Sequence, residues 1–131
     1  MSSPVVLIVE SSPELRRMLE ESLEQRGYAV TSATNTREAL EAMRRRPADL
    51  LIADPPDRAG AEHRALEALC REFPAVPSIV VSPEMLDPAM FTPPRPGEAP
   101  RRRLRRPFSL SELLVLTRHL LSSDDQGSAR F

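Results

Sequence analysis

Short apolar runs alternate with helix signals along most of this chain, and that alternation constrains the fold more than any other feature. The first run, VVLIV at residues 5–9, is β-branched and uninterrupted, which is typical of a strand buried on both faces of a parallel sheet. Three more runs follow, YAVTSA at 28–33, DLLIAD at 49–54 and SIVVS at 78–82. Strands that alternate with helices predict an α/β fold with a doubly wound, mainly parallel sheet and right-handed crossovers.

Two capping patterns mark where helices begin between these runs. Ser11 is followed three residues later by Glu14, which predicts the start of a helix over residues 13–27. Asn35 followed by Glu38 repeats the pattern for a second helix. In each pair the side chains can bond backbone N–H groups that the first turn of a helix leaves without partners.

The third helix carries an apolar stripe formed by Leu66, Leu69, Cys70 and Phe73. Cys70 is the only cysteine of the chain, so no internal disulfide can form and a reducing compartment is expected. Because Cys70 lies on the apolar side of the helix, we interpret it as a small buried hydrophobic residue rather than a nucleophile.

The segment from 83 to 100 interrupts the alternation. It holds six prolines and one glycine, and each proline removes a backbone donor and clashes with the preceding helical turn. We therefore expect at most one helical turn near 84–91 and otherwise an extended, mobile loop. This loop would shorten or replace the helix that connects the fourth strand to a fifth.

The arginine-rich stretch at 101–106 stands where a fifth strand of the sheet belongs. After it, Ser109 and Glu112 form the capping pair of a strong closing helix. The chain is thus expected to form one domain over 1–121 that ends with this helix, followed by a disordered tail over 122–131.

Polar side chains stand at the carboxyl ends of the expected strands. Glu10 and Ser11 come after the first strand, and Asp54 ends the third. Ser82 ends the fourth strand, and Arg106 follows the fifth. Since the ligand site of an open α/β sheet lies beyond the carboxyl ends of its strands, at the switch in strand order, we expect these groups to gather at one edge.

This arrangement resembles the receiver domain of two-component response regulators over about residues 4–121. The resemblance is carried by the stretches VLIVESSPELRRMLEESLEQRGYAV, ADLLIAD, PSIVVS and RPF. It implies a flavodoxin-like, five-stranded fold in which Asp54 accepts a phosphoryl group from a histidine kinase. Ser82 would contact the phosphoryl oxygens, Arg106 takes the place of the family's lysine, and Arg103 stands at the family's aromatic switch position.

The resemblance also implies a Mg²⁺ site at Glu10, Asp54 and Pro56. A carboxylate that attacks phosphorus develops negative charge, which a divalent ion and a fixed cation stabilise. In this chain Ser11 stands where the family has a second acid that ligates the metal directly. We therefore expect Mg²⁺ to bind only weakly. Glu10 is interpreted either as a weak metal ligand or as a partner of Arg106.

Further positions depart from the family pattern. Arg103 brings no aromatic ring to the switch position, and Pro83 stands where the family has a small flexible residue. Arg106 replaces a compact ammonium by a planar guanidinium. We interpret the chain as a degenerate receiver domain that acts through protein–protein interaction, without regulated phosphorylation and without enzymatic activity. The alternative is a working, Mg²⁺-dependent phosphoacceptor with aspartyl-phosphate at Asp54.

The arginine run leaves three interpretations open, which concern Arg101, Arg102, Arg103 and Arg105. They form a solvated edge that blocks strand pairing, a nucleic-acid patch, or a docking surface for an acidic protein partner. The run offers no aromatic ring for base stacking, and the formal net charge of the chain is -1, which disfavours nucleic acid. We favour the protein partner. Within the run, Leu104 should point inward and Arg103 and Arg105 to the opposite side.

The remaining signals bear on location and partners. The N-terminal apolar run is too short for a signal peptide or a membrane span, so we expect a cytoplasmic protein without a membrane partner. His63 and His119 have no metal-like spacing to other ligands and are expected at the surface. A histidine kinase is the expected partner if Asp54 is phosphorylated, and formation of a homodimer is left open.

Overall fold

The computed structural model describes residues 3–55, 60–82 and 94–129 and contains a five-stranded parallel sheet with the order β2-β1-β3-β4-β5. The strands are β1 (Val5–Val9), β2 (Ala29–Ala33), β3 (Leu50–Ala53), β4 (Ser78–Ser82) and β5 (Arg101–Arg105). The helices are α1 (Pro13–Gln25), α2 (Thr36–Arg45), α3 (Ala61–Glu72) and α4 (Leu110–Ala129). The doubly wound α/β fold is therefore confirmed, and each predicted strand end agrees to within one residue.

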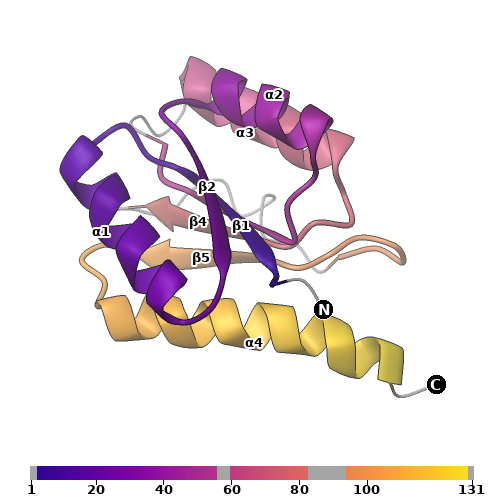
Figure 1. Cartoon of the computed structure of the whole chain (residues 1–131). Coiled ribbons are helices and arrows are strands. Elements are labelled where there is room, and N and C mark those ends of the chain that lie inside the picture. The colour runs from indigo at the N-terminus through magenta and orange to yellow at the C-terminus, as the bar shows by residue number, and fades with distance from the viewer. Residues whose placement is uncertain (1–2, 56–59, 83–93, 130–131) are drawn as a thin grey trace.

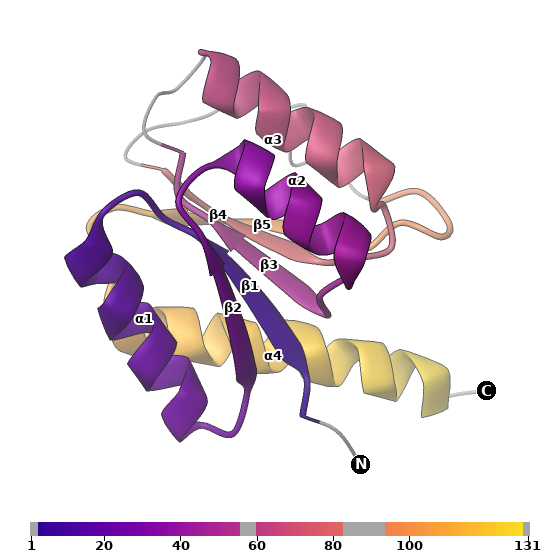
Figure 2. The ribbon, with the colours of Figure 1, turned by 45° about the horizontal axis from the view of Figure 1, so that its top comes forward.

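Two helices cover each face of the sheet. Figure 1 shows α2 and α3 on one face and α1 and α4 on the other, and Figure 2 shows the same layers after a turn of the view. Met43 and Leu66 belong to the core under α2 and α3, whereas Leu23 and Leu113 belong to the core under α1 and α4. Full burial of such a side chain contributes about 1.5–3 kcal/mol. Both helix layers therefore hold the sheet in place.

The parallel sheet brings the carboxyl ends of its strands to one edge. β1 lies between β2 and β3, so the strand order reverses next to β1. The Glu10 N–H donates to the Ala33 carbonyl, and the Asp54 N–H donates to the Val9 carbonyl, both at 3.0 Å. These bonds fix Glu10 and Asp54 on either side of the switch point, where open α/β sheets bind their ligands.

The first helix has its cap one residue later than predicted. The N-cap is Ser12, whose Oγ accepts a hydrogen bond from the backbone N–H three residues further on, at 3.3 Å. The predicted cap at Ser11 is wrong, because Glu10 Oε2 accepts from the Ser12 N–H at 3.0 Å and so fixes the second serine at the helix start. The second cap is confirmed, since Asn35 Oδ1 accepts from the Glu38 N–H at 2.9 Å.

The closing helix begins as predicted and ends later. Ser109 Oγ accepts from the Glu112 N–H, and Glu112 Oε1 accepts from the Ser109 N–H, both at 3.1 Å. The helix then continues to Ala129, beyond the predicted end of the domain at residue 121, and the predicted disorder of residues 122–131 stays a prediction. No proline follows residue 121, and extending a helix that has already formed is easier than starting one. The predicted domain boundary itself stays a prediction.

The helices in the described part of the chain were compared in length and hydropathy with what a membrane span requires, and this comparison concerns those helices alone. None of them is both long enough and apolar enough to cross a membrane.

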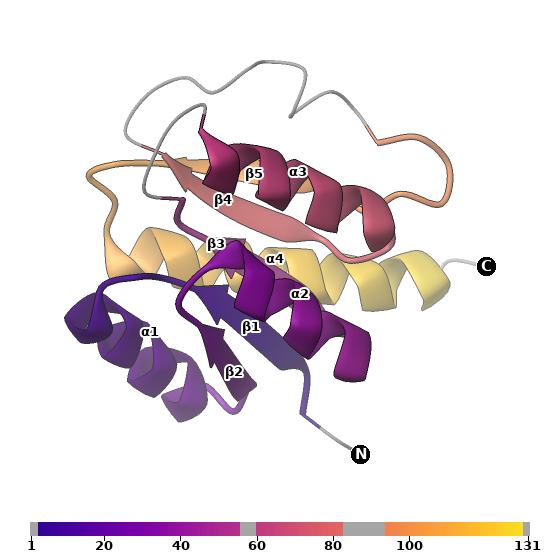
Figure 3. The same cartoon turned by 90° about the horizontal axis from the view of Figure 1, so that it is seen from above.

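The end of the proline-rich segment forms a hydrogen-bonded turn rather than the predicted extended loop. The Glu98 N–H donates to the Arg95 carbonyl at 2.9 Å. Between them Gly97 has φ of 88°, and a proline followed by a left-handed glycine is typical of a type II turn. The Ala99 N–H donates to the Pro74 carbonyl at 2.8 Å, which ties the turn to the end of α3 (Figure 3). The predicted helical turn near 84–91, and the predicted shortening or loss of the helix between the fourth and fifth strands, fall on residues outside the described ranges.

Candidate functional site

Asp54 is a buried carboxylate at the end of β3. Its side chain is 5% exposed. Its Oδ2 accepts a hydrogen bond from Nη2 of Arg106, and its Oδ1 is buried without a hydrogen-bond partner among the described residues. The result is a charge-assisted ion pair that leaves one buried acceptor free.

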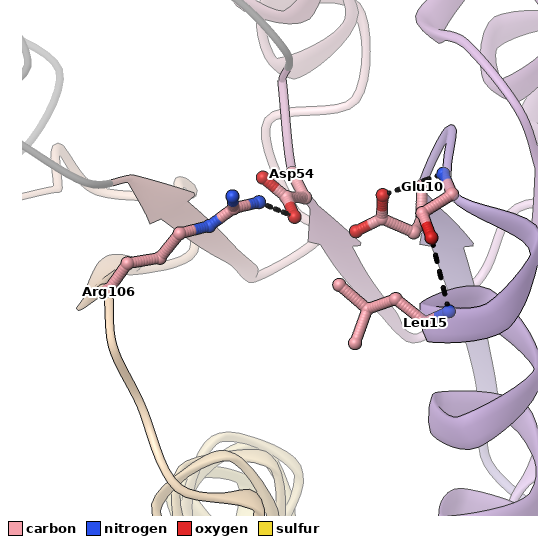
Figure 4. A network of polar contacts seen from close by, with 5 residues as sticks. Glu10, Leu15, Asp54 and Arg106 are labelled. Carbon is pink, nitrogen blue, oxygen red and sulfur yellow. Dashed lines mark hydrogen bonds and ion pairs between the residues drawn. The ribbon is translucent and has the colours of Figure 1, made fainter.

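Arg106 reaches this carboxylate from the end of β5. Figure 4 shows the guanidinium directed at Asp54 from the side opposite Glu10. The Arg106 side chain is 42% exposed, so the pair is half open to water and its contribution to stability is screened. The predicted contact with Asp54 is confirmed. Among the described residues, Arg106 forms an ion pair with Asp54 and none with Glu10, so the alternative partner assignment for Glu10 is wrong.

Glu10 places a second buried carboxylate beside Asp54. The residue follows β1 and is 4% exposed. Its Oε2 accepts from the Ser12 N–H, and its backbone carbonyl accepts from Arg16 Nη1 at 2.9 Å, so the first turns of α1 hold it. Its Oε1 is buried and has no hydrogen-bond partner in the described part of the chain. The close-up shows the Glu10 carboxylate directed toward Asp54, between β1 and β3 (Figure 4).

Two unpartnered carboxylate oxygens at one sheet edge are suited to a cation. A buried acceptor without a partner costs about 1–3 kcal/mol, and a divalent ion would satisfy both. Mg²⁺ usually binds through one or two carboxylates together with water and phosphate oxygens. Glu10 Oε1 and Asp54 Oδ1 fit that donor set. A third ligand of this type is missing from the described residues, which contain no cluster of three or more acidic, histidine or cysteine side chains arranged for a metal.

Ser82 and Pro56 are the other two residues predicted for the phosphoryl and metal site. Ser82 ends β4 and pairs in register with Arg105, which places its backbone at the same edge as Asp54. Its phosphoryl contact stays a prediction. Pro56 lies outside the described residues, and its part in a metal site stays a prediction as well.

The second half of β5 alternates between the two faces of the sheet. Leu104 is buried in the core under α1 and α4, while Arg103 and Arg105 point to the opposite face, as predicted. Arg105 is exposed. Arg103 is half-buried, and its roles at the switch position and in partner binding stay predictions. Its neighbour on β4 is Val80, which belongs to the core under α2 and α3, and this core partly encloses it.

In the first half of β5, two further arginines also lie on opposite faces of the sheet. Arg101 is half-buried on the face that α3 covers, and Arg102 is exposed on the other face. β5 ends the strand order in the described sheet, and charge along an outer strand disfavours pairing with another chain. A solvated edge, which was one of the three interpretations, thus describes Arg102 better than Arg101.

Sequence reasoning missed an apolar groove between β5 and α4. The groove has a volume of about 510 Å³, and its lining includes Leu104, Val115, Leu116 and His119. Val115 is 68% exposed. The signal was present in four consecutive apolar residues at 113–116, because four successive positions of a helix cannot all face one core.

The predictions for the remaining residues are confirmed in two cases and wrong in one. Cys70 is buried, as predicted, and His119 is exposed. His63 is half-buried, and its Nδ1 is buried without a partner among the described residues. The prediction of a surface position is therefore wrong for His63, which lies in the first turn of α3.

Comparison with known proteins points to one family and one fold. The profile of the response regulator receiver domain family matches residues 6–91. Similar solved structures include the chemotaxis protein CheY4 of Vibrio cholerae, with 22% identity, 92% of this chain and 100% of that chain covered, and a TM-score of 0.74. A response regulator from Thermotoga maritima has 25% identity, coverage of 92% and 98%, and a TM-score of 0.71. The beryllofluoride-activated NtrC receiver domain has 22% identity, coverage of 94% and 98%, and a TM-score of 0.76.

No curated protein sequence matches the chain. The structural likenesses therefore support the flavodoxin-like receiver fold. The family match adds sequence evidence over residues 6–91, which contain all of β1 except its first residue and the whole of β2, β3 and β4.

Proposed function

We propose that this chain, which belongs to the response regulator receiver domain family, is a signalling module that works by binding another protein. Receiver domains interact with histidine kinases and other proteins in two-component signalling. In this proposal the domain is degenerate, so that its function needs no regulated phosphorylation and no enzymatic activity, and it works in the cytoplasm.

The ion pair between Asp54 and Arg106 carries the proposal. A carboxylate that attacks phosphorus needs a free oxygen lone pair and a cation that stabilises the developing charge. The guanidinium bonded to Oδ2 already balances the charge of Asp54 and competes for its lone pairs. This charge balance within the chain supports a fixed state of the site rather than a switch.

Mg²⁺ is a weak ligand in this proposal. Glu10 Oε1 and Asp54 Oδ1 would hold it, and Ser11 supplies a hydroxyl where the family has a carboxylate ligand. A bound ion would supply charge neutralisation for a transferred phosphoryl group. With two carboxylates and a competing guanidinium, we expect a dissociation constant in the millimolar range, which is a binding free energy of about -4 kcal/mol.

The partner would bind over β5 and α4. The groove between them offers apolar contacts, and Val115 projects from it with 68% of its surface exposed. Arg102 is exposed on the groove side of β5 and Arg105 on the other side of this outer strand, so the partner has to reach around the edge to contact both, and arginine is enriched in protein interfaces. Arg103 adds a half-buried charge between them. We therefore expect a partner that presents an apolar side chain flanked by acidic residues.

An amide NMR titration of the full chain with Mg²⁺ and beryllofluoride tests the degenerate state, since beryllofluoride mimics a phosphorylated carboxylate. We expect no saturation below millimolar Mg²⁺ and no beryllofluoride-dependent shifts at Asp54 or Ser82. Asp54→Asn is the matched control, because it removes the charge and keeps the shape of the side chain.

A working phosphoacceptor is the second candidate, and the two unpartnered carboxylate oxygens favour it. They leave acceptors at the place where the family holds its metal. Micromolar Mg²⁺ binding, together with beryllofluoride shifts that disappear in Asp54→Asn, would establish this candidate and overturn the degenerate one.

A further inference from the structure

A pocket of about 470 Å³ lies at the opposite edge of the sheet from Asp54. Ser78 and Arg101 line it, and these two residues begin β4 and β5 and pair in register. Asp54, in contrast, follows the carboxyl end of β3. Parallel strands keep their amino ends together at one edge, so the length of the strands separates this pocket from the Asp54 site.

Positive charge dominates the lining of the pocket. In the described part of the chain, three guanidinium groups line it, those of Arg71, Arg95 and Arg101, against one carboxylate, that of Glu98. Glu98 Oε1 accepts from the Arg95 backbone N–H at 2.9 Å, so this carboxylate is engaged with the main chain. Arg71 pairs with Glu67 on its own helix at 3.6 Å, with 71% of the Arg71 side chain exposed, and such a pair is weak.

The guanidinium groups of Arg95 and Arg101 are available to a ligand. Neither forms an ion pair with a carboxylate among the described residues, in contrast to Arg106 at the other end of β5. Arg101 is half-buried, and its charge is sheltered enough to act on a neighbour, since it lowers the pKa of the Cys70 thiol against the larger effect of burial, which raises it. A sheltered cation without a counter-charge attracts an anion more strongly than an exposed one.

The pocket is preorganised and has an apolar wall. Arg95 sits in the hydrogen-bonded turn that Gly97 closes and that Ala99 ties to the end of α3, so binding would not have to order this backbone. Val76 and Ala99 line the same pocket with Pro74. A volume of about 470 Å³ falls within the usual range for small-molecule sites, about 300–1,000 Å³.

We propose that this pocket binds a small phosphate monoester, with the phosphate between Arg95 and Arg101 and an apolar or planar body against the wall that contains Val76. Guanidinium forks match phosphate oxygens in a bidentate way, and two of them balance a dianion. The inference goes beyond the protein-binding function proposed above, because the pocket lies at the other edge of the sheet and contains neither Asp54 nor the groove at α4.

An amide NMR titration of the full chain with AMP, inorganic phosphate and adenosine tests the site. We expect AMP to shift the amides of Cys70, Ser78 and Ala99 with saturation, and inorganic phosphate to shift the same amides at least about tenfold more weakly, because it lacks the body that contacts the wall. Adenosine, which lacks the anion, should leave them unchanged.

The variants Arg101→Gln and Arg95→Gln should each weaken AMP binding at least about tenfold, since a charge-assisted hydrogen bond contributes about 1.5–3 kcal/mol. Arg102→Gln is the matched control: it removes the same charge from the next position of the strand, on the other face, and should leave the affinity within about twofold, as expected for an exposed position. Arg95→Gln changes the turn and not the sheet, so it remains informative if Arg101→Gln fails to fold.

Three results would overturn the proposal: no AMP-dependent shifts at this edge, equal losses in Arg101→Gln and Arg102→Gln, or shifts that move to Glu10 and Asp54. Asp54→Asn separates the two proposals. AMP binding that persists in this variant supports the separate pocket whether or not the domain is a working phosphoacceptor.

Discussion

The two ends of β5 carry the same residue type in opposite circumstances. Arg106 follows the carboxyl end of the strand and is bonded to Asp54, although 42% of its side chain is exposed. Arg101 begins the strand, is half-buried, and has no carboxylate partner among the described residues. Arg101, which is the less exposed of the two, is thus the arginine without a carboxylate partner among the described residues. Desolvation alone would favour the reverse, because a buried charge needs a partner more than an exposed one does.

This difference indicates which kind of charged ligand each edge of the sheet is suited to bind. At the carboxyl edge two buried carboxylates dominate, and Arg106 acts as an internal counter-ion. At the amino edge cations dominate around a pocket, whose described lining supplies one engaged carboxylate. Where a cation of the chain offsets part of the negative charge, as at the carboxyl edge, a cationic ligand is attracted only weakly, while a larger uncompensated charge of one sign attracts the other sign more strongly.

The largest effect should come from reversing the charges of the two arginines that lie between the ends of β5. The double variant Arg103→Glu with Arg105→Glu should abolish partner binding, at least about a hundredfold, because like charges would then face an acidic partner. Asp54→Asn should leave partner binding nearly unchanged. Pull-down with the cognate partner, or the cellular phenotype, measures both. Loss of function in Asp54→Asn with a silent double variant would show that the phosphoryl switch survived and that the arginines form only a solvated edge.

A salt titration checks that the same arginines do not bind nucleic acid. Each phosphate contact would give a log–log slope of about -0.9 in affinity against salt concentration. We expect no detectable binding of duplex DNA to the full chain at low salt. Binding with a steep slope, lost in the double variant, would instead identify the run as a nucleic-acid patch.

The next largest effect concerns the metal. Ser11→Asp restores a carboxylate next to Glu10 and should tighten Mg²⁺ binding at least about tenfold, or about 1.4 kcal/mol. Ser11 is exposed and precedes the cap of α1, so the change should be tolerated, and an acid near a helix N-terminus is favourable. Ser11→Asn is the control without charge. Equal Mg²⁺ affinities of the two variants by NMR titration would show that the missing carboxylate does not limit the site.

The fold was predictable because its signals are local. Uninterrupted apolar runs fix the strands, and a capping residue fixes a helix start when one candidate stands alone, as at Asn35 and Ser109. Where two serines are adjacent, as at Ser11 and Ser12, the choice depends on a contact with Glu10 that the sequence does not reveal. The end of α4 was missed for a similar reason, since no residue type there forces a stop.

The candidate sites were predictable only in part because they depend on partners distant in sequence. Asp54 and Arg106 could be joined because a fold rule brings strand ends together. No comparable rule connects Arg101 with Arg95, and the prolines around Arg95 suggested an extended loop although a proline followed by Gly97 is itself a turn signal. The unpaired state of Arg101 is visible only once the surroundings are known.

A smaller effect should distinguish Arg106 from Arg101 by their contributions to the free energy of unfolding. Arg106→Ala should lower the free energy of unfolding by about 1–2 kcal/mol, because Asp54 would stay buried without its cation, and the value is reduced by the exposure of the pair. Arg101→Ala should change it by less than about 0.5 kcal/mol, since Arg101 forms no ion pair with a carboxylate among the described residues. Urea unfolding at neutral pH measures both. Equal losses would mean that the ion pair at Asp54 contributes nothing beyond packing of the arginine stem.

The smallest effect is electrostatic and reports on Arg101 alone. Burial raises the pKa of the Cys70 thiol above its ordinary value of 9.0, and the charge of Arg101 lowers it in part. The thiolate is the reactive form, so the rate of iodoacetamide alkylation should rise with pH through a midpoint above that value. Arg101→Gln removes the lowering effect and should move the midpoint to still higher pH, whereas Arg102→Gln, on the other face, should not. Because Cys70 is the only cysteine, the rate reports this position without interference, and the midpoint is independent of how accessible the thiol is. A midpoint at or below the ordinary value, or the same displacement in both variants, would show that the charge of Arg101 is not sheltered, and the contrast between the two ends of β5 would lose its electrostatic basis.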